Sequence, residues 1–172
     1  YGKKNLLEKM EQFIVGGGSV VDSTCKNYDE EILPRKFEAG LQDYAGIIGF
    51  GEACRYLQKI GFKKIGSHVN KLNKIITNEL KGNKKVKIIG PLDSEKRNGI
   101  FTFYVDGMDS HNVAKILDSS KNIAVRSGAF CVHSWFNEYK VAGAVRASLY
   151  LYNTEEEARI FVDEVKKITK LV

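Results

Sequence analysis

The sequence predicts an α+β fold, with helices packed on a small mixed or antiparallel sheet and an N-terminal connecting arm ahead of them. Two observations support this class. Helical and strand-like segments follow one another from about residue 44, whereas residues 1–42 carry few helical periods and are punctuated by Gly and Pro. We therefore expect an arm over residues 1–42 and a domain over residues 43–172, a length sufficient for one hydrophobic core.

Two helices are expected in the first part of this domain. Apolar residues recur at spacings of three and four from about Tyr44, where Gly61 is a suitable stop signal, and again up to Gly82. Cys54 falls on the apolar side of the first helix, so we expect it on a buried helix face rather than in a reactive site.

Strands are expected where β-branched and aromatic residues cluster, at Val86–Ile89, Ile100–Val105, Ile123–Arg126 and Val145–Leu149. Asp109 or Ser110 is suited to cap a helix between the second and third strands. Thr154 and Glu157 have the spacing of a capping box, which predicts the start of an amphipathic final helix.

Composition excludes several classes of function. The net charge of +6 comes from dispersed lysines, without the clustered charge and interleaved aromatic residues of a nucleic-acid binder. No apolar run approaches the roughly 18 residues of a membrane span. Cys25, Cys54 and Cys131 form no Cys-x-x-Cys pair, so neither a disulfide framework nor a metal site is expected. Reduced thiols in a cytoplasmic protein are the expectation.

The segment around Cys131 is the most informative one for chemistry. Cys131 follows Arg126 by five residues, in a Gly-containing loop that leaves an expected strand. A thiol becomes nucleophilic where nearby positive charge favours the thiolate, and Arg126 and His133 are candidate neighbours. Judged from spacing alone, a buried structural cysteine is the more common alternative.

Arg146 is the second candidate, because it interrupts an otherwise apolar strand. A guanidinium in that position needs a partner, which is either an internal carboxylate or the α-carboxylate of an amino-acid substrate. His68 and His111 fall in helical stretches without metal-ligand spacing. The run Gly16–Ser19 matches no phosphate-binding pattern and is interpreted as a turn.

Three ordered motifs carry a family resemblance over essentially the whole chain. They are Phe-Glu-Ala-Gly ending at Gly40, Arg-Ser-Gly-x-x-Cys from Arg126 to Cys131, and Arg-Ala-Ser-Leu-x-x-Tyr-Asn-Thr from Arg146 to Thr154. The sequence resembles the Suf-type cysteine desulfurases, which are fold-type I pyridoxal-phosphate enzymes of the class V aminotransferase superfamily. The resemblance implies the small C-terminal domain of such an enzyme, together with its connecting arm.

The resemblance also implies roles for particular residues. Cys131 matches the cysteine that takes sulfur from L-cysteine as a persulfide and releases alanine, for iron–sulfur cluster assembly. Arg146 matches the arginine that binds the substrate carboxylate, and Arg126 matches a second arginine near the substrate. Gly40 and Leu41 correspond to a loop that reaches the cofactor phosphate of the partner subunit in a homodimer. A protein that accepts the sulfur is implied as a further partner.

The sequence departs from the family pattern in three places. The lysine that binds pyridoxal phosphate in the family is not in this chain, so we expect the chain alone to be inactive. Leu41 stands where many relatives have Thr, which removes a hydroxyl contact to the phosphate. Ala129 and Phe130 stand where His is common, so a proton-transfer role for His would be lost or would pass to His133.

Two other interpretations of the function are compatible with the sequence. Another class V enzyme, such as an aminotransferase, a selenocysteine lyase or an amino-acid epimerase, would keep the role of Arg146 and leave Cys131 idle. A non-catalytic half-protein that acts as a docking or regulatory domain belongs to a different class of function. The Arg-Ser-Gly-x-x-Cys motif favours desulfuration over the other class V activities. Tyr1 and Gly2 resemble an internal phrase of the family, which favours part of a full enzyme over a half-protein.

Overall fold

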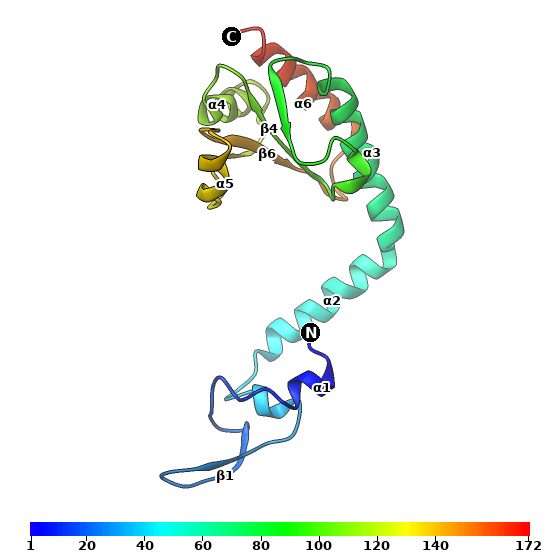
Figure 1. The fold of residues 1–172 in the computed structure, drawn as a ribbon. Coiled ribbons are helices and arrows are strands. Elements are labelled where there is room, and N and C mark those ends of the chain that lie inside the picture. Colours follow the sequence, from blue (N-terminus) through cyan, green and yellow to red (C-terminus); the bar gives the residue numbers. More distant parts are fainter. The chain divides into compact units, whose positions relative to one another are not determined.

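A computed structural model describes all residues from 1 to 172. Contacts within the chain divide it into two compact units, Tyr1–Leu57 and Gln58–Val172 (Figure 1). The boundary between the units falls inside a helix, and the expected domain division after residue 42 stays a prediction. Every helix is either too short or too polar to cross a membrane.

The first unit is built from short elements. They are α1 (Lys4–Leu7), β1 (Val20–Ser23), β2 (Tyr28–Glu30), the 3-10 turn η1 (Arg35–Phe37) and most of α2 (Tyr44–Ile60). β1 and β2 form an antiparallel hairpin with a register irregularity between Val20 and Asp22. The expectation of short strands in this region is therefore confirmed.

Buried polar groups hold the first unit together. The Nζ atom of Lys36 lies 2.7 Å from Oε2 of Glu30, and this lysine is almost fully buried. The side-chain amide of Gln12 donates to the main-chain carbonyls of Ser19 and Lys36 at 2.6 and 2.8 Å. The amide of Ser19 donates to the carbonyl of Gly16 at 3.1 Å, which confirms the turn expected at the glycine run.

The second unit contains the larger sheet. Its elements are α3 (Phe62–Leu80), β3 (Val86–Ile89), η2 (Ser94–Lys96), β4 (Ile100–Val105), α4 (Ser110–Lys121), β5 (Arg126–Gly128), α5 (His133–Glu138), β6 (Ala144–Ser148) and α6 (Glu155–Ile168). The strand order is β3-β4-β6-β5, and every neighbouring pair is antiparallel. The α+β class and the antiparallel option expected from the sequence are both confirmed.

One face of this sheet supports the hydrophobic core. Phe101 and Phe103 on β4 stand opposite Ala147 and Val145 on β6, and their rings contact Phe161 of α6 edge-on at 6.3 and 5.9 Å. α6 packs against both α3 and α4 (Figure 1). Because side chains alternate along a strand, the intervening residues of β4 and β6 point to the opposite face. That face is free to carry polar groups.

The predicted helix starts agree with the structure. The carboxylate of Asp109 accepts from the amides of His111 and Asn112, which makes it the N-cap of α4. Thr154 and Glu157 form a complete capping box at the start of α6. Local side-chain chemistry determines both ends, which is why sequence alone located them.

The third strand was predicted three residues too early. The ladder uses Arg126–Gly128, whereas residues 123–125 lie outside it. The side chains of Ile123 and Val125 are partly buried against the core, so packing rather than strand pairing explains their apolar character. The last strand begins one residue before the predicted start, and the six-residue helix α5 was not predicted.

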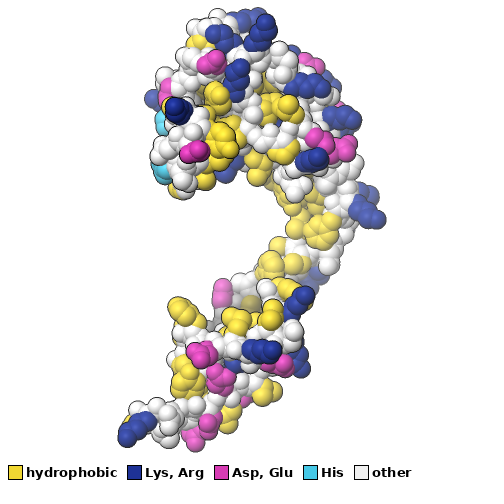
Figure 2. Space-filling view, viewed as in Figure 1, with side chains coloured by type: hydrophobic (Ala, Val, Ile, Leu, Met, Phe, Trp, Pro, Cys, Tyr) yellow, Lys and Arg dark blue, Asp and Glu magenta, His cyan; other side chains and the backbone are white.

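The prediction of a buried face on α2 is wrong for the residues of this chain. α2 has no buried residue, and Cys54 is only half-buried. Ile47, Ile48 and Phe50 are exposed, and hydrophobic side chains are visible along the surface of α2 in Figure 2. The apolar spacing predicted the helix correctly, but no residue of the first unit buries its apolar side chains.

Candidate functional site

Two arginines face each other across neighbouring strands of the larger sheet. In the β5–β6 ladder, Arg126 is the direct partner of Arg146, and in the β4–β6 ladder Thr102 is the partner of Arg146 on its other side. Directly opposed residues project from the same face of a sheet. Arg126 and Arg146 therefore share the face opposite the hydrophobic core, although they are 20 residues apart in sequence.

Neither arginine forms an ion pair with a carboxylate of this chain. Arg146 is half-buried, its Nε atom is buried without a hydrogen-bond acceptor, and its guanidinium carbon lies 5.5 Å from the ring centre of Phe130. Like charges opposed across a ladder are unfavourable in the absence of an anion between or beside them. This arrangement suits a carboxylate, which guanidinium groups bind in bidentate fashion.

The loop that carries Cys131 leaves the sheet beside these arginines. The ring of Phe130, the neighbour of Cys131, contacts the guanidinium of Arg146 and also the ring of Phe136 of α5, with the two ring centres 5.8 Å apart. Phe130 and Cys131 both adopt left-handed backbone conformations, with φ of 52° and 59°. Cys131 is exposed and free. The loop therefore presents an accessible thiol, not the buried structural cysteine that was the alternative from spacing alone.

The remaining candidate residues occupy different surroundings. His133 is the first residue of α5 and is exposed. Gly40 belongs to the first unit, has φ of 80°, and donates its amide to the carbonyl of Gly17 at 2.8 Å. Leu41 is 94% exposed. The amide of Gly40 is thus already used within the chain, and the apolar side chain of Leu41 offers no hydrogen bond.

Sequence reasoning missed the contact that His111 makes behind the arginine pair. Its Nδ1 atom lies 2.9 Å from Oγ of Ser127, the residue that follows Arg126. Both His68 and His111 lie in helices as predicted, and Nε2 of His68 is 2.8 Å from the main-chain carbonyl oxygen of Asn153. No sequence pattern predicts a contact between His111 and Ser127, because these residues are 16 positions apart and α4 and β5 come together only in the folded unit.

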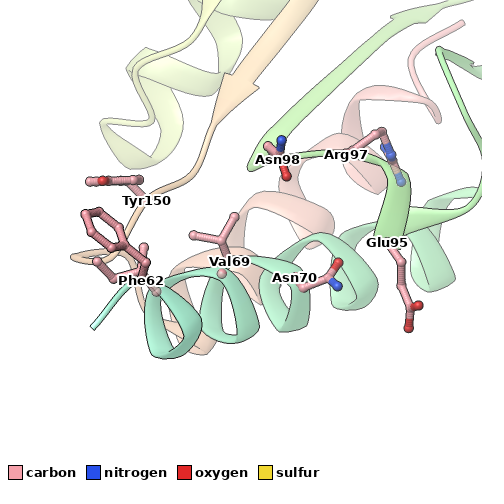
Figure 3. Close-up of a pocket in the computed structure, with 9 residues that line it drawn as sticks. Phe62, Val69, Asn70, Glu95, Arg97, Asn98 and Tyr150 are labelled. Atoms are coloured by element: carbon pink, nitrogen blue, oxygen red, sulfur yellow. The ribbon is translucent and has the colours of Figure 1, made fainter. Parts of the chain in front are cut away.

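The cavity in Figure 3 lies elsewhere in the second unit and contains none of the candidate residues. It has a volume of about 400 Å³, with Phe62 and Tyr150 at one end and Arg97 toward the other. Arg97 is only 8% exposed, and its Nε and Nη1 atoms have no acceptor. Burial lowers the pKa of this guanidinium from its usual value, and nearby Asp93 partly opposes the shift.

Arg97 is expected to contribute to stability through packing rather than charge. Its guanidinium carbon lies 5.3 Å from the ring centre of Phe101, and Nη2 donates to the hydroxyl of Thr77, which itself donates to the carbonyl of Asn73. Arg97→Met should change the free energy of unfolding by less than about 1 kcal/mol, because it keeps the volume and removes a poorly paired buried charge. Arg97→Ala should lower it by about 2–3 kcal/mol by leaving a cavity.

Urea unfolding of both Arg97 variants, beside Lys96→Met at the exposed neighbouring position, measures this difference. If Arg97→Met were as destabilising as Arg97→Ala, the hydrogen bonds of the guanidinium rather than its volume would be responsible.

The sequence is similar to those of known enzymes over most of its length. Residues 1–161 match the aminotransferase class-V family. The chain is 33% identical to a probable cysteine desulfurase of Methanothermobacter thermautotrophicus, over 98% of this chain and 42% of the relative. It is 36% identical to a probable cysteine desulfurase of Staphylococcus aureus, over 97% of this chain and 40% of the relative. The chain thus spans about two fifths of the length of these curated relatives.

Solved structures agree with the sequence matches. The structure of the apo cysteine desulfurase from Thermococcus onnurineus superposes with a TM-score of 0.91 and 32% sequence identity, over 100% of this chain and 42% of the solved one. The family match covers both compact units and includes the arginine pair and the Cys131 loop. The chain belongs to the aminotransferase class-V family.

Proposed function

We propose that this chain is the part of a cysteine desulfurase that provides the sulfur-accepting thiol and the binding site for the substrate carboxylate. One observation carries the proposal. Arg126 and Arg146 face each other without a carboxylate partner, next to the loop that presents the exposed thiol of Cys131. Relatives named as cysteine desulfurases, which align over nearly the whole chain, support it further.

Arg146 and Arg126 bind the α-carboxylate of L-cysteine in this proposal. Arg146 is the better fixed of the two, because it lies in the middle of β6 and contacts the Phe130 ring. Its planar group supplies parallel N–H donors for a bidentate contact. Arg126 lies on the edge strand and is exposed, so it adds a second positive charge and steers the anionic end of the substrate.

Cys131 acts as the nucleophile. Its thiolate attacks the sulfur of the bound cysteine, so that a sulfur–sulfur bond forms while the bond from carbon to sulfur breaks. The electron pair of that bond stays with the carbon fragment, which takes up a proton and leaves as alanine. The products are alanine and a persulfide on Cys131, so neither an oxidant nor a reductant is consumed.

The reaction implies pyridoxal phosphate, which acts as an electron sink when bound. The residues of this chain fit the side of the site that faces the substrate carboxylate. They fit the phosphate less well, because the amide of Gly40 already donates a hydrogen bond to the carbonyl of Gly17 and Leu41 carries no hydroxyl. The proposed contact of Gly40 and Leu41 with the phosphate of a partner subunit would thus be limited to main-chain groups of this turn.

Further parts of the proposal concern the whole protein. They are a homodimeric enzyme in the cytoplasm, a protein acceptor that collects the persulfide sulfur, and iron–sulfur cluster assembly as the destination of that sulfur. The exposed position of Cys131 supports transfer to an acceptor, since a partner must reach the sulfur atom. His133, two residues further on and exposed, is the proposed auxiliary group for proton transfer.

The test uses the protein expressed from the complete reading frame. Incubated with L-cysteine and pyridoxal phosphate, it should release alanine and carry one additional sulfur atom on the peptide that contains Cys131. Mass spectrometry of alkylated peptides measures the modification. Alanine release with the sulfur on another cysteine, or no release at all, would overturn the proposal.

A further inference from the structure

The first turn of α4 supports the strand that carries Arg126. His111 lies in this turn, and its ring nitrogen contacts the hydroxyl of Ser127 at 2.9 Å. Ser127 stands opposite Val145, which is fully buried in the core. The side chain of Ser127 therefore points to the helix-covered face of the sheet, while that of Arg126 points to the open face.

The same turn of α4 also meets both ends of the segment that carries Cys131. A Cβ atom placed on Gly128 would lie 3.5 Å from Cε1 of His111, in a glycine with φ of 106°. A Cβ atom placed on Gly143 would lie 2.8 Å from Oγ of Ser110 and 3.4 Å from the Cα atom of Gly128. The segment thus leaves and rejoins the sheet at one point, beside Ser110 and His111.

The register of β5 needs this support. β5 is three residues long, lies at the edge of the sheet and pairs only with β6. Its pairing places the positive charges of Arg126 and Arg146 opposite each other, which disfavours the observed register in the absence of a bound anion. A slip of one residue would move Arg126 to the other face of the sheet.

We propose that His111 is a positioning residue: its hydrogen bond to Ser127 holds the register of β5 and thereby the placement of Arg126 and of the Cys131 segment. The catalytic meaning of this role rests on the proposed desulfurase function. The positioning itself is a property of the chain and can be measured without cofactor or substrate.

Amide hydrogen exchange of the protein expressed from the complete reading frame, measured without cofactor or substrate, tests the role. His111→Ala and Ser127→Ala should each accelerate exchange about fivefold at those amides of residues 126–128 that donate to β6, the factor expected for the loss of one neutral hydrogen bond. The double variant should exchange no faster than either single variant, because both remove the same bond. His111→Asn, whose side-chain amide can donate or accept in the place of Nδ1, should restore slow exchange.

Two controls separate positioning from general stability. Lys115→Ala, at an exposed position of α4, should leave exchange at residues 126–128 unchanged. Exchange in β4 and α6 should stay at the wild-type rate in every variant. Wild-type exchange in both single variants, additive effects in the double variant, or equal acceleration throughout the second unit would each overturn the proposal.

A failed desulfuration assay has a different meaning from a failed exchange experiment. The first would remove the function of the loop and leave its support by His111 standing. The second would remove the support and leave the chemistry of Cys131 standing.

Discussion

Cys131→Ala is expected to abolish the conversion of L-cysteine to alanine and persulfide, with a loss of at least about a thousandfold in kcat. The exposed thiol of Cys131 is the proposed nucleophile, and no second cysteine lies within ten residues of it in sequence. Methyl replacement leaves no group to accept the sulfur. The measurement is alanine release together with sulfur content of the protein, in the enzyme from the complete reading frame.

Cys25 provides the matched control for this experiment. It is also exposed and free, but it lies in the turn between β1 and β2, which contains none of the candidate site residues. Cys25→Ala should therefore keep wild-type alanine release. Cys131→Ser should be as inactive as Cys131→Ala, since a hydroxyl has the shape of the thiol without its affinity for sulfur. Full activity in both Cys131 variants would mean that the thiol has no part in the reaction.

Arg146→Met is expected to lower activity without lowering stability. Loss of the charge-assisted contact with the substrate carboxylate should lower kcat/KM for L-cysteine roughly 10- to 100-fold, mainly through KM. In the free protein the same substitution removes a buried Nε atom without an acceptor and an opposed charge from the ladder. The free energy of unfolding should therefore stay unchanged or rise by a few tenths of a kcal/mol.

Steady-state kinetics and urea unfolding of one preparation test both parts. Arg159→Met, at an exposed position of α6, is the matched control. It should leave kcat/KM unchanged and alter the free energy of unfolding by no more than a few tenths of a kcal/mol. Arg126→Met should show a smaller kinetic effect, because Arg126 lies on the exposed edge strand. A large loss of stability in Arg146→Met would show that the guanidinium is structural and would remove it from the substrate site.

The sequence predicted most accurately those elements that local chemistry determines. The capping box of Thr154 and Glu157 and the cap at Asp109 depend on residues within three positions of one another. Both strands at 86–89 and 100–105 were predicted to the residue, because β-branched and aromatic side chains fill them. α5 was missed because six residues are too few to display a helical period.

The candidate site depends on contacts that sequence spacing cannot contain. Arg126, Arg146 and Cys131 were identified individually, through motifs. Their arrangement follows from the β5–β6 register, which the predicted strand at 123–126 did not describe. The contact between His111 and Ser127 joins two elements through the tertiary fold. Residue types therefore indicated the chemistry, whereas pairing between strands determined the geometry.

The close approach of Gly128 and Gly143 has a consequence for how such a fold can diversify. Because the two ends of the segment between them meet beside the first turn of α4, a change in the length of the segment does not have to alter the spacing of β5 and β6. We therefore expect the exposed part of residues 129–142 to tolerate insertions and deletions without a change in strand order, provided that Phe130 and the buried Phe136 are kept. Loop-closure entropy grows only slowly with length, so such changes are inexpensive. Differences in reactivity among proteins with this fold are therefore expected within this segment, whereas Gly128 and Gly143 stay fixed at its two ends.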